Sequence, residues 1–469
     1  MAKKTEKTEF EKVKEELLTS HENGVRKAGP DEVKKADAFC EPYKAFLDAA
    51  KTEREAVAYT VKAAEKAGFV PFDCKGKYKP GDKVYYVNRG KAVILAVFGK
   101  KKCVKGVRIA AAHIDSPRLD LKPNPLYEQN DMAFFKTHYY GGIKKYQWTA
   151  IPLALHGKVV KRDGETVTVN LGEDAGDPQF CVTDLLPHLA REQMTKTMQK
   201  GITGENLNIL VGSRPFGGDE GSDAVKLNVM AALNKKYGMV EQDFLSAELE
   251  LVPAFRATDL GFDRSMIGAY GHDDRVCAYT ALQAVLDTEA PEHTAITVLT
   301  DKEETGSDGN TGLQSAYLAD FVADLARMEG AEARDVFRRS SCLSADVNAA
   351  YDPTYSSVYD PNNSAYINNG VVVTKYTGAG GKGDTSDASA EFMAQVRSLM
   401  NGNNIVWQTG ELGKVDEGGG GTVAKYIANL DVDVVDVGVP VLSMHAPFEV
   451  VSKLDVYMTY RSFLAFFNQ

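Results

Sequence analysis

The feature that most restricts the fold is a regular alternation of apolar runs and amphipathic segments in the second half of the chain. Short apolar runs typical of buried strands alternate there with longer segments whose apolar residues recur at helical spacing. This alternation favours a doubly wound α/β fold, in which a mixed, mostly parallel sheet carries helices on both faces. The predicted strands are residues 249–252, 295–299, 343–346, 371–375, 405–408 and 434–437, and the predicted helices are residues 276–286, 313–325, 388–400, 422–429 and 453–467.

The N-terminal part of the chain predicts further elements of the same fold. Apolar residues recur at steps of three and four within residues 1–67, which indicates helices. Residues 84–98 predict a strand hairpin, and the apolar run at residues 107–112 predicts a buried strand.

A middle segment interrupts this pattern. Between residues 123 and 247 short β-like runs with turn residues predominate, apart from a helical stretch near residues 186–200 and a glycine-rich loop at residues 201–221. We therefore predict a catalytic domain of residues 1–122 and 248–469, interrupted by an inserted β-rich domain at residues 123–247.

Composition excludes several classes of protein. With 469 residues, 43% of them hydrophobic and 26% charged, the chain has the balance of a globular protein. Its net charge of −10 repels phosphates and anionic lipids, so neither nucleic acid nor a membrane is an expected partner. The start of the sequence lacks the apolar core of a secretory signal. The six scattered cysteines suit reduced thiols, and we expect a cytoplasmic protein.

Five acidic or histidine-containing motifs follow apolar runs at the predicted strand ends. Ligands of open α/β sheets gather beyond the carboxyl ends of the strands, so these side chains are expected to converge. Two histidines and three carboxylates supply the nitrogen and oxygen donors that zinc accepts, and a carboxylate between two cations offsets their repulsion. The absence of cysteine from the motifs favours an open catalytic site. The motifs are His113-Ile114-Asp115-Ser116-Pro117, His272-Asp273-Asp274-Arg275, Asp301-Lys302-Glu303-Glu304-Thr305-Gly306, Ser344-Ala345-Asp346 and Ser443-Met444-His445-Ala446.

These motifs, in this order, resemble the aspartyl aminopeptidase / aminopeptidase I family of dizinc aminopeptidases. The resemblance covers nearly the whole chain and implies a doubly wound catalytic domain interrupted by a β-rich domain that mediates assembly, commonly into dodecamers. The segments that carry it are HIDSPRLDLKPNP, LLPHLAREQ, GHDDR, DKEETGS, SADVNAAYDP and GTVAKYIANLDVDVVDVGVPVLSMHAPFEV.

The resemblance implies a specific set of metal ligands. Asp273 would bridge two zinc ions. His113 and Asp346 would complete the coordination of one zinc, and Glu304 and His445 that of the other. Cobalt and manganese also accept such ligands and are possible substitutes.

The resemblance also implies roles for four further residues. Glu303 would be the general base, and Asp115 would hydrogen-bond His113 and fix its tautomer. His188 would approach the substrate of a neighbouring subunit. Lys375 occupies the position at which members that prefer acidic residues place a basic group, although a surface lysine explains it equally well.

The function expected from these residues is removal of single N-terminal residues from peptides with a free amine, by a homo-dodecamer built from dimers. The alternatives are a dinuclear-metal carboxypeptidase or deacylase and an inactive scaffold of the same fold. The run Gly418–Gly421 lacks the Gly-Lys-Ser/Thr ending of a phosphate-binding loop, so a loop beside the substrate or a flexible connection is favoured. The preferred N-terminal residue is left open.

Overall fold

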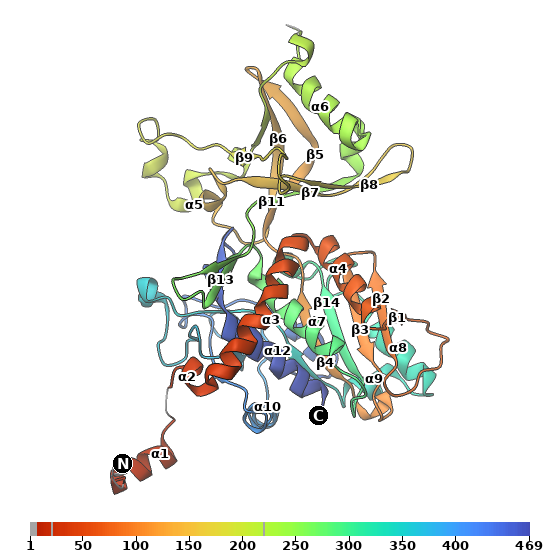
Figure 1. Ribbon diagram of the computed structural model, residues 1–469, viewed down its shortest axis with the longest axis vertical. Helices are drawn as coiled ribbons and strands as arrows, with labels where there is room; N and C mark the ends of the chain where they lie inside the picture. The colour runs from red at the N-terminus through yellow and green to blue at the C-terminus, as the bar shows by residue number, and fades with distance from the viewer. Residues whose placement is uncertain (1–6, 20–21, 219–220) are drawn as a thin grey trace.

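The structure is a computed structural model that describes residues 7–19, 22–218 and 221–469. Three sheets organise it, and the largest has nine strands (Figure 1). In spatial order these strands are β1 (Val70–Pro71), β2 (Lys83–Asn88), β3 (Ala92–Val97), β14 (Ala295–Thr300), β4 (Arg108–His113), β15 (Ser341–Ser344), β19 (Asp433–Gly438), β17 (Val371–Thr374) and β18 (Trp407–Thr409).

The centre of the nine-stranded sheet is parallel and its flanks are mixed. Strands β14, β4, β15 and β19 run parallel to their neighbours within this group, whereas β3 and β17 pair with it in the antiparallel sense. Helices lie on both faces, so the predicted doubly wound α/β fold with a mixed sheet is confirmed. The helices of the described residues are α1 (Glu9–Leu17), α2 (Gly24–Ala28), α3 (Pro30–Ala49), α4 (Glu53–Lys66), α5 (Met198–Gly201), α6 (Ala224–Tyr237), α7 (His272–Leu286), α8 (Tyr317–Met328), α9 (Ala333–Phe337), α10 (Ala390–Gly402), α11 (Ala424–Ala428) and α12 (Lys453–Phe467).

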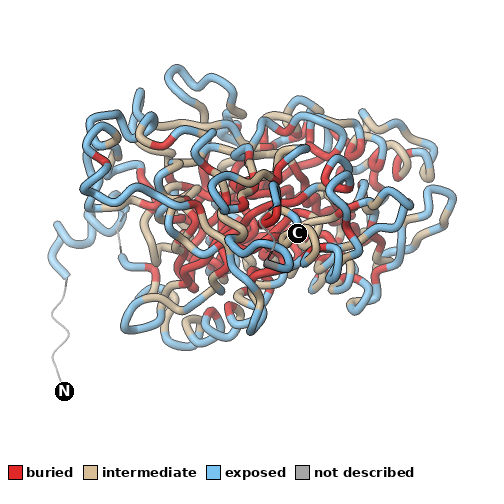
Figure 2. The backbone as a smooth tube through the Cα atoms, turned by 90° about the horizontal axis from the view of Figure 1, so that it is seen from above, coloured by how far each residue is buried: buried red, intermediate tan, exposed pale blue. Residues whose placement is uncertain are grey.

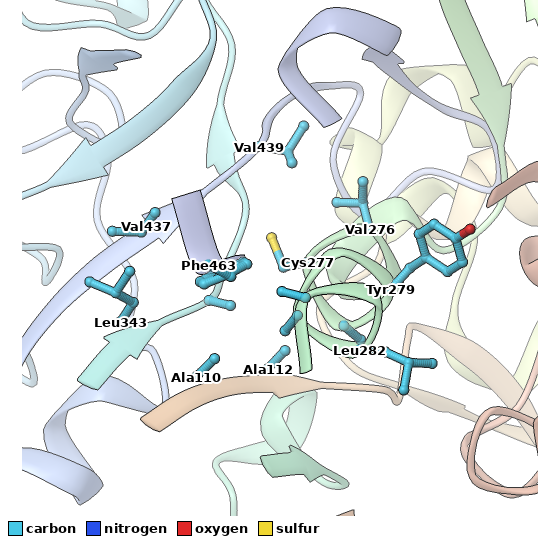
Figure 3. Close-up of a cluster of buried hydrophobic side chains, with 14 of the residues drawn as sticks. Ala110, Ala112, Val276, Cys277, Tyr279, Leu282, Leu343, Val437, Val439 and Phe463 are labelled. Carbon is cyan, nitrogen blue, oxygen red and sulfur yellow. The ribbon is translucent and has the colours of Figure 1, made fainter. Parts of the chain in front are cut away.

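The core explains why β4 is apolar throughout. Alternate residues of a strand point to opposite faces of the sheet. Ala110 and Ala112 belong to a cluster with residues of α7 and α12, as Figure 3 shows for Cys277 and Phe463. Ile109 belongs instead to a second cluster with residues of α8 and α11. Buried residues therefore fill the interior of the molecule on both sides of the sheet, with exposed loops around them (Figure 2).

A seven-stranded antiparallel sheet stands above the nine-stranded sheet in Figure 1, and the third sheet has five strands. The seven strands in spatial order are β8 (Thr166–Leu171), β7 (Leu153–Val160), β11 (Ala247–Pro253), β5 (Arg118–Gln129), β6 (Met132–Tyr140), β10 (Ile209–Gly212) and β9 (Cys181–Val182). The five strands are β12 (Thr258–Leu260), β13 (Met266–Ala269), β21 (Glu449–Ser452), β20 (Pro440–Leu442) and β16 (Asn348–Ala349).

One predicted strand belongs to a different sheet. Residues 249–252 were expected to begin the second part of the parallel sheet, but they lie in β11, which pairs in the antiparallel sense with β7 and β5. A short apolar run is compatible with burial in either kind of sheet, so its sequence does not select its partners. The seven-stranded sheet thus spans Arg118 to Pro253, and the predicted domain limits stay a prediction.

The predicted helix at residues 186–200 is wrong. This stretch contains only a 3-10 turn at Gln193–Thr195 and the beginning of α5. An amphipathic helix is stabilised mainly by burying its apolar face, and within the described residues this segment leaves most of its apolar side chains uncovered. Its large apolar side chains are exposed, namely Leu185, Leu186, Leu189, Met194 and Met198.

Buried charged contacts join the seven-stranded sheet to the nine-stranded part. His156 Nδ1 on β7 lies 2.8 Å from Glu55 Oε1 on α4. Arg118, the first residue of β5, lies 3.3 Å through Nη1 from Glu53 Oε2. Its guanidinium carbon lies 4.0 Å from the ring centroid of Tyr140 at the end of β6. The contacts of Arg118 thus connect the start of β5 and the end of β6 to α4, near the carboxyl end of β4.

The expectations of no membrane partner and of reduced cysteines concern the helices and the thiols of the described residues. None of the helices in this part of the chain is both long enough and apolar enough to cross a membrane. All six cysteines lie in the described residues, and they are free thiols.

Candidate metal centre

The predicted donor residues converge beyond the ends of three adjacent parallel strands. His113 is the last residue of β4, Asp346 follows β15, and Glu303 begins a 3-10 turn (Glu303–Thr305) just after β14. Asp273 lies at the start of α7, and His445 lies in the loop between β20 and β21. Segments far apart in the sequence therefore contribute to one site, as expected for an open α/β sheet.

Asp273 lies between two imidazole rings. Its Oδ1 is 3.1 Å from His113 Nε2, and its Oδ2 is 3.1 Å from His445 Nε2. Asp346 Oδ1 lies 3.9 Å from His113 Nε2, and Glu304 Oε2 lies 3.6 Å from His445 Nε2. Two groups of donors result, each with one histidine and one carboxylate besides the shared Asp273.

Glu303 lies beside these groups without belonging to either. Its Oε2 is 3.7 Å from His113 Nε2, and the side chain lines the adjacent cavity. Burial is the main reason that the pKa of Glu303 is raised to about 7. The neighbouring positions 303 and 304 thus differ, because only Glu304 joins a donor group.

Asp115 connects the first histidine to the turn that carries Glu303. His113 Nδ1 lies 3.0 Å from the backbone oxygen of Asp115 and 3.4 Å from its Oδ1. The backbone N–H groups of Glu303 and Glu304 donate to Asp115 Oδ1 and Oδ2, each at 3.2 Å. Asp115 therefore contacts the imidazole, mainly through its backbone oxygen, and its carboxylate holds a turn of the backbone.

Three further groups that the sequence analysis did not select support the centre. Glu449 Oε1 accepts from the backbone N–H of His445 at 2.6 Å, and its Oε2 accepts from that of Asp273 at 3.0 Å. Gly142 O lies 2.8 Å from His445 Nδ1, and Tyr140 Oη donates to Asp115 at 2.7 Å. Glu449 was visible as the acidic residue four positions after His445, whereas Tyr140 and Gly142 carried no recognisable signal.

The electrostatics of the cluster favour a positive charge. Burial would raise the pKa of Asp273, but the two histidines hold it below its ordinary value. Burial, with Asp273 nearby, raises the pKa of Glu304 well above its usual range, and burial together with Glu303 does the same for Asp346. Four carboxyl groups thus share a buried space, and their mutual repulsion is relieved when cations are bound.

The donor set fits divalent cations. Imidazole nitrogens and carboxylate oxygens are ligands that zinc accepts, and no cysteine takes part. Glu304 Oε1 is buried and has no hydrogen-bond partner among the described residues. Since an unsatisfied buried carboxylate oxygen is costly, this atom is suited to coordinate a metal.

A cavity of about 360 Å³ opens beside the donors. Its wall contains carboxylates, threonines, an asparagine and a few apolar side chains, and none of the described residues that line it is a lysine or an arginine. The lining residues are Gly142, Asp273, Glu303, Glu304, Asp346, Val347, Asn348, Thr374, Thr377, Leu412, Gly419, Gly420, Gly421, Thr422, Asp436, Met444 and His445. Most of the glycine run 418–421 is therefore part of the cavity wall.

The two residues predicted to bind substrate, Lys375 and His188, are not among the described residues that line the cavity. Lys375 follows β17, pairs with Asp387, and does not line the cavity, although its neighbour Thr374 does. His188 is exposed in the segment before the 3-10 turn Gln193–Thr195. Within one chain it is not among the groups of donors or the cavity residues.

Imidazoles and carboxylates that converge at the strand ends of an α/β sheet, next to a cavity, define the class of metal-dependent hydrolases. The family described as aminopeptidase I zinc metalloprotease (M18) matches residues 46–467. The chain therefore belongs to the M18 family of zinc aminopeptidases.

Relatives and solved structures agree with this assignment. The chain is 49% identical over 461 residues to a probable M18 family aminopeptidase 1 of Clostridium acetobutylicum, covering 97% of this chain and 99% of the relative. The crystal structure of the M18 aminopeptidase of Thermotoga maritima has a TM-score of 0.92 and 43% identity, covering 96% of this chain and 100% of that one. The yeast mApe1 dodecamer shares the fold, with a TM-score of 0.75 and 21% identity over 93% of this chain and 97% of that one.

Proposed function

We propose that the protein removes single N-terminal residues from peptides with two zinc ions per subunit. Asp273 would bridge the ions, with His113 and Asp346 on one side and Glu304 and His445 on the other. The observation that carries the proposal is that the two oxygens of Asp273 each lie 3.1 Å from a different imidazole.

The chain's own residues have distinct tasks in this reaction. When bound, a pair of divalent cations supplies the Lewis acidity that polarises a peptide carbonyl and acidifies water. The carboxylate of Glu303 accepts a proton from the attacking water and delivers it to the leaving amine. Asp115 contacts the backbone of Glu303 and the ring of His113, which keeps the carboxylate of Glu303 close to the proposed metal ligand His113. The buried carboxylates beside the cavity suit a positively charged α-amine, which restricts cleavage to the first peptide bond.

The test compares peptides with free and blocked amines. The zinc-loaded protein is expected to hydrolyse a leucyl anilide, and N-acetylation of the same substrate is expected to lower kcat/KM by at least about 10²-fold, because the ammonium contact is lost and the neutral amide is left beside buried carboxylates. Removal of metal by a chelator should abolish hydrolysis, and zinc should restore it. Release of acetate from the acetylated substrate would instead indicate a deacylase, and inactivity toward both anilides would contradict the aminopeptidase and favour a carboxypeptidase or a scaffold.

The cavity also predicts which N-terminal residues are accepted. Asp436 lies in its wall, where Thr422 Oγ1 donates to Asp436 Oδ1 at 2.8 Å, and Asn348 Oδ1 is buried with no partner among the described residues. An acidic substrate side chain would lie beside these hydrogen-bond acceptors, and the described lining residues offer no lysine or arginine to neutralise its charge. We expect kcat/KM for N-terminal leucine or lysine to exceed that for aspartate by about 10-fold or more, measured with matched dipeptides.

Lys375 provides the control for that prediction. If Lys375 binds substrate, as predicted from the family resemblance, the Lys375→Met variant should lose activity only on N-terminal aspartate and glutamate. If the cavity wall alone determines the preference, the variant should keep the parent ratio between leucine and aspartate. A parent enzyme that favours aspartate would contradict the expectation drawn from Asp436.

We propose a homo-dodecamer built from dimers, located in the cytoplasm. The yeast structure of the same fold is described as a dodecamer, and the exposed apolar residues around His188 suit contact with another subunit. His188 would then approach the substrate of its neighbour. The six free thiols are compatible with a reducing compartment.

A further inference from the structure

The seven-stranded sheet reaches the metal centre through Tyr140, the last residue of β6, and the two glycines that follow it. Tyr140 Oη donates to Asp115 Oδ2 at 2.7 Å, and Gly142 O lies 2.8 Å from His445 Nδ1. Gly141, between them, has a φ of +77°, and a Cβ atom there would lie 3.2 Å from Glu304 Oε2. The segment thus contacts groups associated with both proposed cation positions.

Each carboxylate oxygen of Asp115 has two polar neighbours, and Tyr140 is one of those on Oδ2. Asp115 Oδ1 faces His113 and the N–H of Glu303, whereas Oδ2 accepts from the N–H of Glu304 and from the phenol. The phenol contact is the shorter of the two on Oδ2, at 2.7 Å against 3.2 Å.

Tyr140 is itself held in place. Its side chain is buried, and the guanidinium of Arg118 stacks on the ring. Arg118 is anchored by Glu53 and by Asp120, whose Oδ1 lies 2.8 Å from Arg118 Nε. The phenol is therefore a fixed donor, supported by residues of the seven-stranded sheet and of α4.

We propose that Tyr140 is a positioning residue of the metal centre, acting through Asp115 to fix the ring of His113 and the Glu303–Glu304 backbone. The seven-stranded sheet thereby sets the affinity of the site for metal, in addition to any role in assembly. This inference rests on the two-zinc site proposed above. Partners that orient metal ligands typically change metal affinity by about 10- to 100-fold when they are removed.

The test is zinc affinity of the full-length Tyr140→Phe variant, which lacks the hydroxyl and keeps the ring on Arg118. We expect its zinc Kd, measured by competition with a chromophoric chelator, to weaken by about 10- to 100-fold. With saturating zinc, kcat should fall while KM changes little, since Tyr140 does not line the cavity. The visible spectrum of the cobalt-loaded variant should differ from that of the parent, because the ligand geometry has changed.

Two controls separate positioning from other effects. Tyr139→Phe, at an exposed tyrosine of the same strand, should leave zinc affinity and the cobalt spectrum unchanged. Asp115→Asn keeps the side-chain volume and should weaken zinc at least as much as Tyr140→Phe. Should Tyr140→Phe fail to fold, Tyr140→Leu, which also lacks the hydroxyl, is measured in its place. A zinc affinity of the folded Tyr140 variant within twofold of the parent would overturn the inference, whereas a parent that binds fewer than two zinc ions would overturn the proposed function instead.

Discussion

Replacing Glu303 by glutamine is expected to lower kcat for peptide hydrolysis by about 10²- to 10⁴-fold, the usual contribution of a general base. Glutamine keeps the size of the side chain but cannot accept the proton of the attacking water. Because Glu303 belongs to neither donor group, the variant should still bind zinc with the stoichiometry of the parent. Steady-state kinetics and zinc content of the same preparation provide the measurement.

The matched control for this variant is Glu332→Gln. Glu332 is exposed, pairs with Arg334 and belongs to neither donor group, so its replacement should leave kcat unchanged. A Glu303→Gln enzyme with at least a tenth of the parent kcat would show that another group handles the proton. Loss of zinc in the same variant would instead make Glu303 a ligand.

Replacing Asp273 by asparagine is expected to have the second very large effect, because one side chain serves both proposed cation positions. Asparagine has a single carbonyl oxygen and no charge, so it cannot face both imidazoles as a carboxylate does. We expect fewer than two zinc ions per subunit by elemental analysis. Loss of a metal that supplies several kcal/mol of stabilisation implies a fall in kcat/KM of about 10³-fold or more.

Asp320→Asn on α8 is the control for that variant. Asp320 is exposed in the first turn of its helix and contacts none of the donors, so zinc content and activity should match the parent. Two zinc ions bound tightly by Asp273→Asn would contradict the bridging role, and the site would then have to use Asp346 or Glu304 in its place.

Much of the fold could be predicted because its signals are local. The apolar run of β4 and the helical spacing of α7 and α12 are readable over ten residues or fewer, since burial on one face of a helix or on both faces of a strand determines which residue types are stable there. The convergence of His113, Asp346 and Glu303 was also predictable, because parallel strands end at a common edge.

Other features depend on partners that are distant in the sequence. Leu249 and Leu251 are apolar in β11 as they would be in a parallel strand, and only the pairing with β7 and β5 shows their sheet. The apolar residues near His188 have helical spacing, yet their side chains are exposed among the described residues, and no long helix forms there. The sequence around Tyr140 is that of an ordinary strand, and only the tertiary structure places its hydroxyl against Asp115.

The sequence by itself determined which chemical groups are available: two imidazoles, the carboxylates at the strand ends, and an apolar pattern that favours one class of sheet. The tertiary structure alone decided the geometry, which is that Asp273 lies between His113 and His445 and that Glu303 stays outside both donor groups. The physical reason is that side-chain chemistry and periodicity are local properties, whereas distances of about 3 Å between groups depend on how all the packed elements constrain one another.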